Sequence, residues 1–135
     1  MDKAELMFGA PSRYAAPGAR YRDIDVSARV EGASPHGLVQ ILFDELQKGL
    51  ETLRAAEASG DFARRNAAQA RVTSILHGLE ASLDYQKGGE IAANLGKIYR
   101  EGRRLIATVG PARAEALAEA RTMLGEIAAA WTAIA

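Results

Sequence analysis

Residues 34–60 read SPHGLVQILFDELQKGLETLRAAEASG and carry the clearest helix signal in the chain. The run opens on Ser34, a favoured helix N-cap. Pro35 suits the first helical position, because proline has no N–H to leave unpaired there. Its large apolar residues recur every three or four positions, as one face of a helix requires: Val39, Leu42, Phe43, Leu46, Leu50 and Leu53. We predict one long amphipathic helix that ends at Ser59-Gly60.

Three further amphipathic stretches follow. We expect the second helix from Asp61 to Lys87-Gly88-Gly89, the third from Glu90 to Gly110-Pro111, and the fourth from there onward. Their apolar stripes are Val72, Ile75, Leu76, Leu79 and Leu83; Ile91, Leu95, Ile98, Leu105, Ile106 and Val109; and Leu117, Ala120, Leu124, Ile127, Trp131 and Ile134. Short connections force neighbouring helices to run antiparallel. The predicted fold is therefore all-α, an antiparallel up-down four-helix bundle over residues 34–135.

Residues 1–33 differ from the rest of the chain. They contain Pro11, Pro17 and several glycines, and they show no sustained apolar period. We expect this N-terminal segment to be flexible or to lie over the bundle, with a turn or two of helix around Tyr21, Ile24 and Val30.

Composition excludes several kinds of site. The 135 residues carry 17 Lys plus Arg against 17 Asp plus Glu, and a nucleic-acid binder normally needs a basic excess. The absence of cysteine removes disulfides and thiolate zinc sites. Neither His36 nor His77 has a carboxylate three residues before it, as the Glu-x-x-His pairs of di-metal bundles require. We expect no metal, no cofactor and no nucleic-acid partner.

Catalytic and membrane signals are also missing from the sequence. No Gly-x-Ser-x-Gly elbow or phosphate-binding Gly-rich loop appears, so we do not expect an enzyme. The uncharged stretch Gly32–Phe43 is far shorter than the ~20 apolar residues of a membrane span. Among the arginines of the second and third helices, Glu101 interrupts the group on the third helix and Tyr99 is the only nearby aromatic residue for base stacking, which favours a solvated face. The expected location is the cytoplasm, without stable membrane insertion.

Leu38 and Ile41 lie off the main stripe of the first helix and widen its apolar face. They have two compatible interpretations. The face can be broad because it packs on the core or is covered by residues 1–33. It can also form a groove for an amphipathic partner helix.

Two runs of residues match a known family pattern. The first comprises Ser34-Pro35-His36, Leu38-Val39 and Ile41-Leu42-Phe43-Asp44; the second comprises Ser82-Leu83-Asp84, Lys87-Gly88-Gly89-Glu90-Ile91-Ala92 and Asn94-Leu95. Together with Tyr21, Ile24 and Trp131 they resemble the flagellin-specific export chaperone family, FliS. The likeness extends over about residues 21–135.

The resemblance implies a non-enzymatic cytoplasmic chaperone. Such a protein holds the disordered C-terminal segment of flagellin, blocks premature polymerisation and assists delivery to a component of the flagellar type III export gate. The flagellin groove would include Tyr21, Ile24, Leu38, Ile41, Leu42, Ile91, Leu95 and Tyr99. The remaining matches would mainly fix loops and helix starts: Ser34, Pro35, Ser82, Leu83, Asp84, Gly88, Gly89, Glu90 and Asn94.

The chain also departs from the family pattern. Residues 1–20 extend beyond the usual N-terminus, and the pattern fades between Tyr99 and Arg121. The alternative function is a bundle whose apolar face serves self-association or an unrelated adaptor contact. The sequence leaves open whether free chains form a homodimer.

Overall fold

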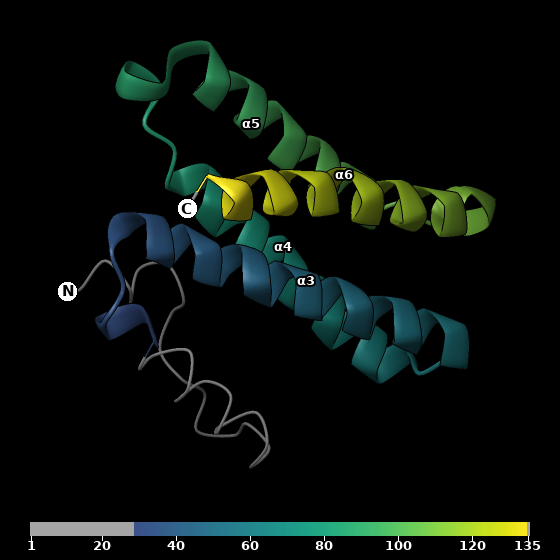
Figure 1. Ribbon diagram of the computed structural model, residues 1–135. Helices are drawn as coiled ribbons and strands as arrows, with labels where there is room; N and C mark the ends of the chain where they lie inside the picture. The colour runs from purple at the N-terminus through teal and green to yellow at the C-terminus, as the bar shows by residue number, and fades with distance from the viewer. Residues whose placement is uncertain (1–28, 135) are drawn as a thin grey trace.

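The computed structural model describes residues 29–134, which form long helices joined by short connections (Figure 1). The helices are α3 (Pro35–Ser59), α4 (Phe62–Ala81), α5 (Tyr85–Ile106) and α6 (Arg113–Ala133), with a 3-10 turn at Gly110–Ala112. Helices α3 and α5 each pack against both α4 and α6. The prediction of an all-α, antiparallel four-helix bundle is confirmed.

The turn between α3 and α4 forms at the residues that the sequence indicates. The Ser34 hydroxyl accepts a hydrogen bond from the Gly37 amide at 3.1 Å, which caps the start of α3. Gly60 ends α3 with a φ of 71°, a conformation that costs glycine little. The Asp61 carboxylate then accepts from the Arg64 amide at 3.1 Å and starts α4.

The boundary between α4 and α5 lies earlier than predicted. Helix α4 ends at Ala81, and Asp84 caps α5 by accepting from the amides of Gln86 and Lys87, each at 3.0 Å. Gly89, with φ 51° and ψ −126°, interrupts α5 after its first turn. The prediction of a helix running to Lys87-Gly88-Gly89 is wrong, because the Asp84 cap begins a new helix before the double glycine is reached.

The outer ends of two predicted apolar stripes also lie outside the core. Helix α5 ends at Ile106, and α6 begins only after the 3-10 turn. Val109 is 79 % exposed and Ile134 is 70 % exposed. Both follow the last regular turn of their helix, where the helical spacing no longer sets which way a side chain points.

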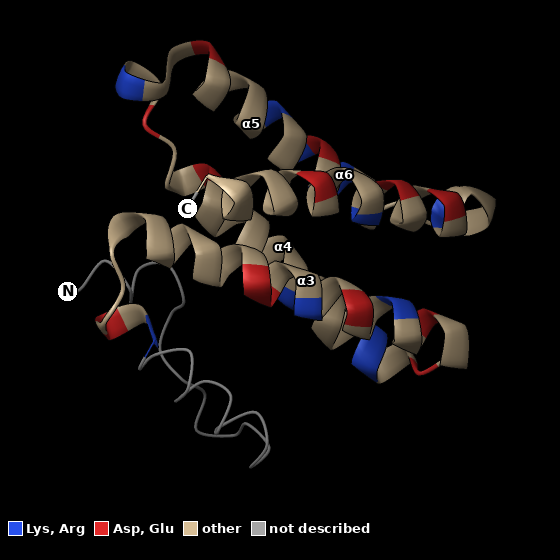
Figure 2. Ribbon diagram, in the orientation of Figure 1, with Lys and Arg blue, Asp and Glu red and all other residues tan. Residues whose placement is uncertain are grey.

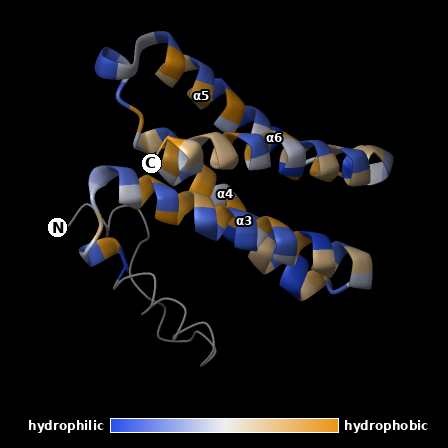
Figure 3. Ribbon diagram, viewed as in Figure 1, coloured by the Kyte–Doolittle hydropathy of each residue, from blue (hydrophilic) through white to orange (hydrophobic). Residues whose placement is uncertain are grey.

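The core is shared by all four helices (Figure 3). Its most completely buried large apolar side chains are Leu42, Phe43, Leu46, Leu53, Val72, Leu76, Leu79, Ile106 and Leu124. Gly49 lets α3 approach α4 closely, since a Cβ atom there would lie 2.8 Å from a methyl group of Val72. A smaller cluster consists of Val30 and Ile41 with Ala33 and Leu38 packed against them.

One acidic side chain is buried among the residues described. Glu45 is 0 % exposed; its carboxylate lies 3.3 Å from Lys48 Nζ and 3.1 Å from Arg71 Nη2 on α4. Such a pair fixes how α3 and α4 are aligned, because displacing one partner would leave a charge buried. No helix in the described range is both long and apolar enough to cross a membrane.

Candidate partner-binding surface

A pocket of about 740 Å³ opens where α3 begins and α4 ends. We call it the end pocket; it is lined by Pro35, Leu38, Val39, Gly78, Ala81, Ser82, Leu83, Asp84, Tyr85 and Gln86. Leu38 and Val39, in the first turns of α3, form one wall. The connection to α5 forms the other, with Leu83 half-buried and Tyr85 exposed. The pocket therefore combines apolar walls with open access.

Two of the four helix ends beside this pocket, those of α3 and α6, carry no charged residues. Figure 2 shows the first turns of α3 and the last turns of α6 free of acidic and basic residues. The sequence has none of either from Gly32 to Phe43, and none after Glu126. A surface of this kind favours an apolar partner, because few charges have to be desolvated when it is covered.

Ion pairs join α4 to α5 next to the end pocket. Glu80, at the end of α4, lies 2.8 Å from Arg100 Nη1 and 2.6 Å from Arg103 Nη2 on α5. These hydrogen bonds, from Arg100 first and then Arg103, hold the pKa of the Glu80 carboxyl below its ordinary value. Hydrogen bonds with Glu80 and, to a smaller extent, Tyr85 raise the pKa of Arg100.

The structure distributes the predicted groove residues over different environments. Leu38 lines the end pocket, Leu95 is half-buried against the core, and Ile91 is 72 % exposed on α5. Leu42 and Tyr99 are 0 % and 3 % exposed and belong to the core, so neither reaches the surface in this structure.

Burial raises the pKa of the Tyr99 hydroxyl to about 12. Ile41 is buried against Val30. Residues 29–33 are held there by an ion pair of 2.9 Å between Arg29 Nη2 and Asp44 Oδ2. Tyr21 and Ile24 lie outside the described residues.

The matched signature residues gather around the same end of the bundle. Ser34 and Asp84 cap helices, and the Ser82 hydroxyl donates to the Leu79 carbonyl oxygen at 2.7 Å. Pro35, Ser82, Leu83 and Asp84 also line the end pocket. Gly88 lies close to Ala92, Gly89 makes the kink in α5, and Glu90 and Asn94 are exposed on the same helix.

Sequence reasoning missed Tyr85 as a pocket residue. It directly follows the capping residue Asp84, and that cap was not recognised as a helix start. With the correct boundary, an aromatic residue in the first turn of α5 would have stood out beside the pocket.

The C-terminal part of α6 contacts the start of α3 through aromatic rings. The His36 ring stacks on Trp131 with ring centres 4.4 Å apart and planes 11° apart, and Trp131 Nε1 donates to the His36 carbonyl oxygen at 3.3 Å. His36 therefore serves as a packing partner here. Within residues 29–134, no group of three His, Cys, Asp or Glu side chains is arranged to hold a metal ion.

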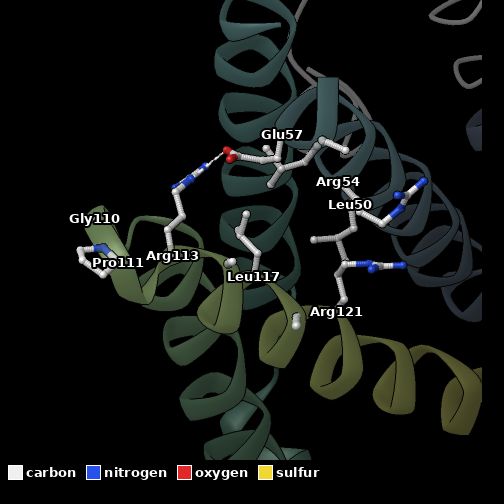
Figure 4. A pocket seen from close by; sticks show the side chains of 12 residues that line it. Leu50, Arg54, Glu57, Gly110, Pro111, Arg113, Leu117 and Arg121 are labelled. Atoms are coloured by element: carbon white, nitrogen blue, oxygen red, sulfur yellow. Dashed lines mark hydrogen bonds and ion pairs between the residues drawn. The ribbon is translucent and has the colours of Figure 1, made fainter. Parts of the chain in front are cut away.

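A second pocket, of about 500 Å³, lies at the opposite end between α3 and α6 (Figure 4). Leu50, Leu53 and Leu117 contribute apolar surface, and Arg54, Arg113 and Arg121 also line it. The three guanidiniums are paired with acids of α3, Arg54 and Arg121 with Glu51 and Arg113 with Glu57. We call this the pinned end of the bundle.

Comparison with known proteins identifies the family. The family model described as "Flagellar protein FliS" matches residues 17–135. The Flagellar secretion chaperone FliS of Salmonella typhimurium is 37% identical over 124 residues, covering 90% of this chain and 92% of that protein. Flagellar secretion chaperone FliSB of Pseudomonas aeruginosa is 31% identical over 121 residues, covering 85% and 92%. The resemblance found in the sequence is thereby confirmed, and the chain belongs to the FliS family of flagellar proteins.

Proposed function

We propose that this protein is a flagellar secretion chaperone that binds the C-terminal segment of flagellin, prevents its premature polymerisation and assists its delivery to the type III export apparatus. Membership of the FliS family supports the coarser statement, a chaperone of flagellar export, because the curated relatives carry that name. The same membership supports a non-enzymatic role.

The end pocket is the observation that carries the finer proposal. Its walls offer Leu38, Val39 and Leu83 to a partner, and the adjoining start of α3 and end of α6 carry no charged residues. Ile91, just beyond the Gly89 kink, adds a 72 % exposed side chain on α5. A disordered segment can bury apolar side chains on such a surface while it becomes helical.

The proposed partner determines where the chaperone acts and when it must release flagellin. Flagellin must be held before export, so the chaperone acts in the cytoplasm. It must also be released at the export gate, which requires contact with a gate component and reversible binding. Apolar contacts offset by the cost of ordering the segment give moderate affinity of this kind.

Isothermal titration calorimetry with a synthetic peptide of the C-terminal segment of flagellin from the same organism tests the proposal. We expect binding with a negative heat-capacity change, because apolar surface is buried. We also expect weak dependence on salt, because few charges lie at the pocket. Absence of binding at micromolar concentrations would contradict the proposal.

Light scattering before and after addition of the peptide tests the alternative of self-association. A chaperone forms a complex with the peptide whatever its own oligomeric state. A bundle that only associates with itself keeps the same mass in both measurements.

A further inference from the structure

Gly96 occupies a buried position in the middle of α5. Glycine weakens a helix interior relative to alanine, so a buried glycine there calls for a packing reason. A Cβ atom at this position would lie 3.1 Å from Tyr85 Oη, 3.2 Å from Arg100 Nη1 and 3.6 Å from Leu83 Cδ1. The missing side chain leaves room for these three groups, and we call this site the Gly96 seat.

Two of the three groups belong to the wall of the end pocket. Leu83 and Tyr85 both line it, and both precede the Gly89 kink. Because the kink at Gly89 breaks the regular helix, the helix after the kink does not by itself fix the positions of Leu83 and Tyr85. Their contact with Gly96 fixes these two side chains against the later part of α5.

Arg100 connects the seat to α4. Its Nη1 atom lies beside Gly96 and 2.8 Å from Glu80 Oε2. Arg103 makes a separate ion pair with Glu80 at 2.6 Å, so α4 and α5 remain joined without Arg100. The particular contribution of Arg100 is thus its position against the Tyr85 hydroxyl.

We propose that Gly96 and Arg100 are positioning residues for the end pocket, holding Leu83 and Tyr85 in the arrangement that the partner segment requires. This inference rests on the proposed function, in which that pocket receives the C-terminal segment of flagellin. Gly96 and Arg100 do not line the pocket; they act through the two side chains that do.

Gly96→Ala is the main test, with Gly125→Ala as its matched control. Both replace a glycine inside a helix, but a Cβ atom at Gly125 would find its nearest neighbour at 3.9 Å. We expect Gly96→Ala to lower affinity for the flagellin peptide about three- to tenfold, as a misfit of a fraction of an ångström in a pocket does. Gly125→Ala should bind as the wild type does. Equal affinity of both variants and the wild type would overturn the inference.

Tyr85→Phe and Arg100→Gln provide a second test that does not depend on how Gly96→Ala folds. Each removes one partner of the contact at the seat, and neither alters a buried residue. If the two act through that contact, their combined effect on affinity is smaller than the product of the single effects. Arg104→Gln is the control, because Arg104 pairs with Glu101 on its own helix. Independent, fully multiplying effects of Tyr85→Phe and Arg100→Gln would overturn the inference.

Amide hydrogen exchange separates failure of this inference from failure of the proposed function. Wild-type protein that ignores the flagellin peptide would contradict the proposed function alone. The positioning role of Gly96 is then tested in the free protein. Amide hydrogen exchange at Gln86, Lys87 and Gly88 should become faster in Gly96→Ala but not in Gly125→Ala. Unchanged exchange at these amides would overturn the positioning role.

Discussion

The two ends of the bundle are built by different means. At the pinned end, Arg113 donates to Glu57 at 2.8 Å, to Gln69 at 2.9 Å and to the carbonyl oxygens of Ile106 and Thr108 at 3.0 and 2.8 Å. One side chain thereby joins α3, α4 and the end of α5 to α6. At the other end, a capped connection and a kinked helix surround an apolar pocket. The contrast teaches that one end can hold the fold while the other is free to receive a partner.

Arg113→Ala tests whether the pinned end holds the fold, and we expect it to have the largest effect. Its side chain is 13% exposed. Its loss would remove the donor of two carbonyl groups and would leave Glu57 with only the longer ion pair of 3.8 Å to Arg65. We expect the free energy of unfolding, measured by urea denaturation, to fall by about 2–4 kcal/mol.

Arg54→Ala is the control for that measurement. Arg54 is exposed and pairs with Glu51 one turn away on the same helix, so its loss should lower the free energy of unfolding far less than the loss of Arg113 does. If the two variants were equally stable, the pinned end would not hold the fold.

Leu38→Asp tests the pocket end, with a smaller expected effect on folding. Leu38 is half-buried at the wall of the end pocket, so a carboxylate there should weaken binding of the flagellin peptide at least about tenfold, or ~1.4 kcal/mol. Circular dichroism should show an unchanged helical signal. Loss of cooperative melting would show instead that Leu38 stabilises the core.

Ile41→Asp sharpens the same comparison. Ile41 is 4% exposed beneath Val30, so a charge there should lower stability by about 2–3 kcal/mol as well as weaken binding. A variant as stable as Leu38→Asp would mean that residues 29–33 leave this face readily.

Glu80→Gln should have the smallest effect, and it depends on pH. The pKa of Glu80 is lowered in the folded protein, so its ion pairs stabilise the fold above the ordinary value of 4.5. That contribution is lost as the pH falls through the lowered pKa. The variant should therefore lose less stability than the wild type between about pH 6 and about pH 3, by about 0.5 kcal/mol after solvent screening. Urea denaturation at both values measures the difference; equal losses in both proteins would assign Glu80 no role in acid sensitivity.

The architecture could be predicted because helix ends are set by local sequence. Helix caps and the left-handed glycine depend only on residues a few positions away. The turn between α3 and α4, formed by Gly60 and Asp61, and the start of α3 at Ser34 could therefore be placed correctly. Asp84 is an equally local signal, but the paired glycines Gly88-Gly89 are a stronger indication of a helix end, so the sequence predicts the boundary too late.

The candidate site could be predicted only in part, because helical spacing assigns a face without saying what covers it. Leu42 and Ile91 both belong to predicted groove positions, yet one is 0% and the other 72% exposed. Arg113 contacts Gln69 and Glu57, which lie 44 and 56 residues away in the sequence, and helical periodicity does not predict contacts between such distant residues. The Gly96 seat likewise becomes visible only when the kink at Gly89 is known.

The stacking of Trp131 on His36 provides an intrinsic fluorescence probe. Trp131 is the single tryptophan of the chain, and it touches the residue beside Pro35 of the end pocket. All tryptophan fluorescence of the protein therefore comes from one known site, the contact between the end of α6 and the start of α3. A partner that separates the Trp131 and His36 rings on binding should therefore change the intrinsic fluorescence of the unlabelled protein, whereas a partner that leaves this contact intact should not.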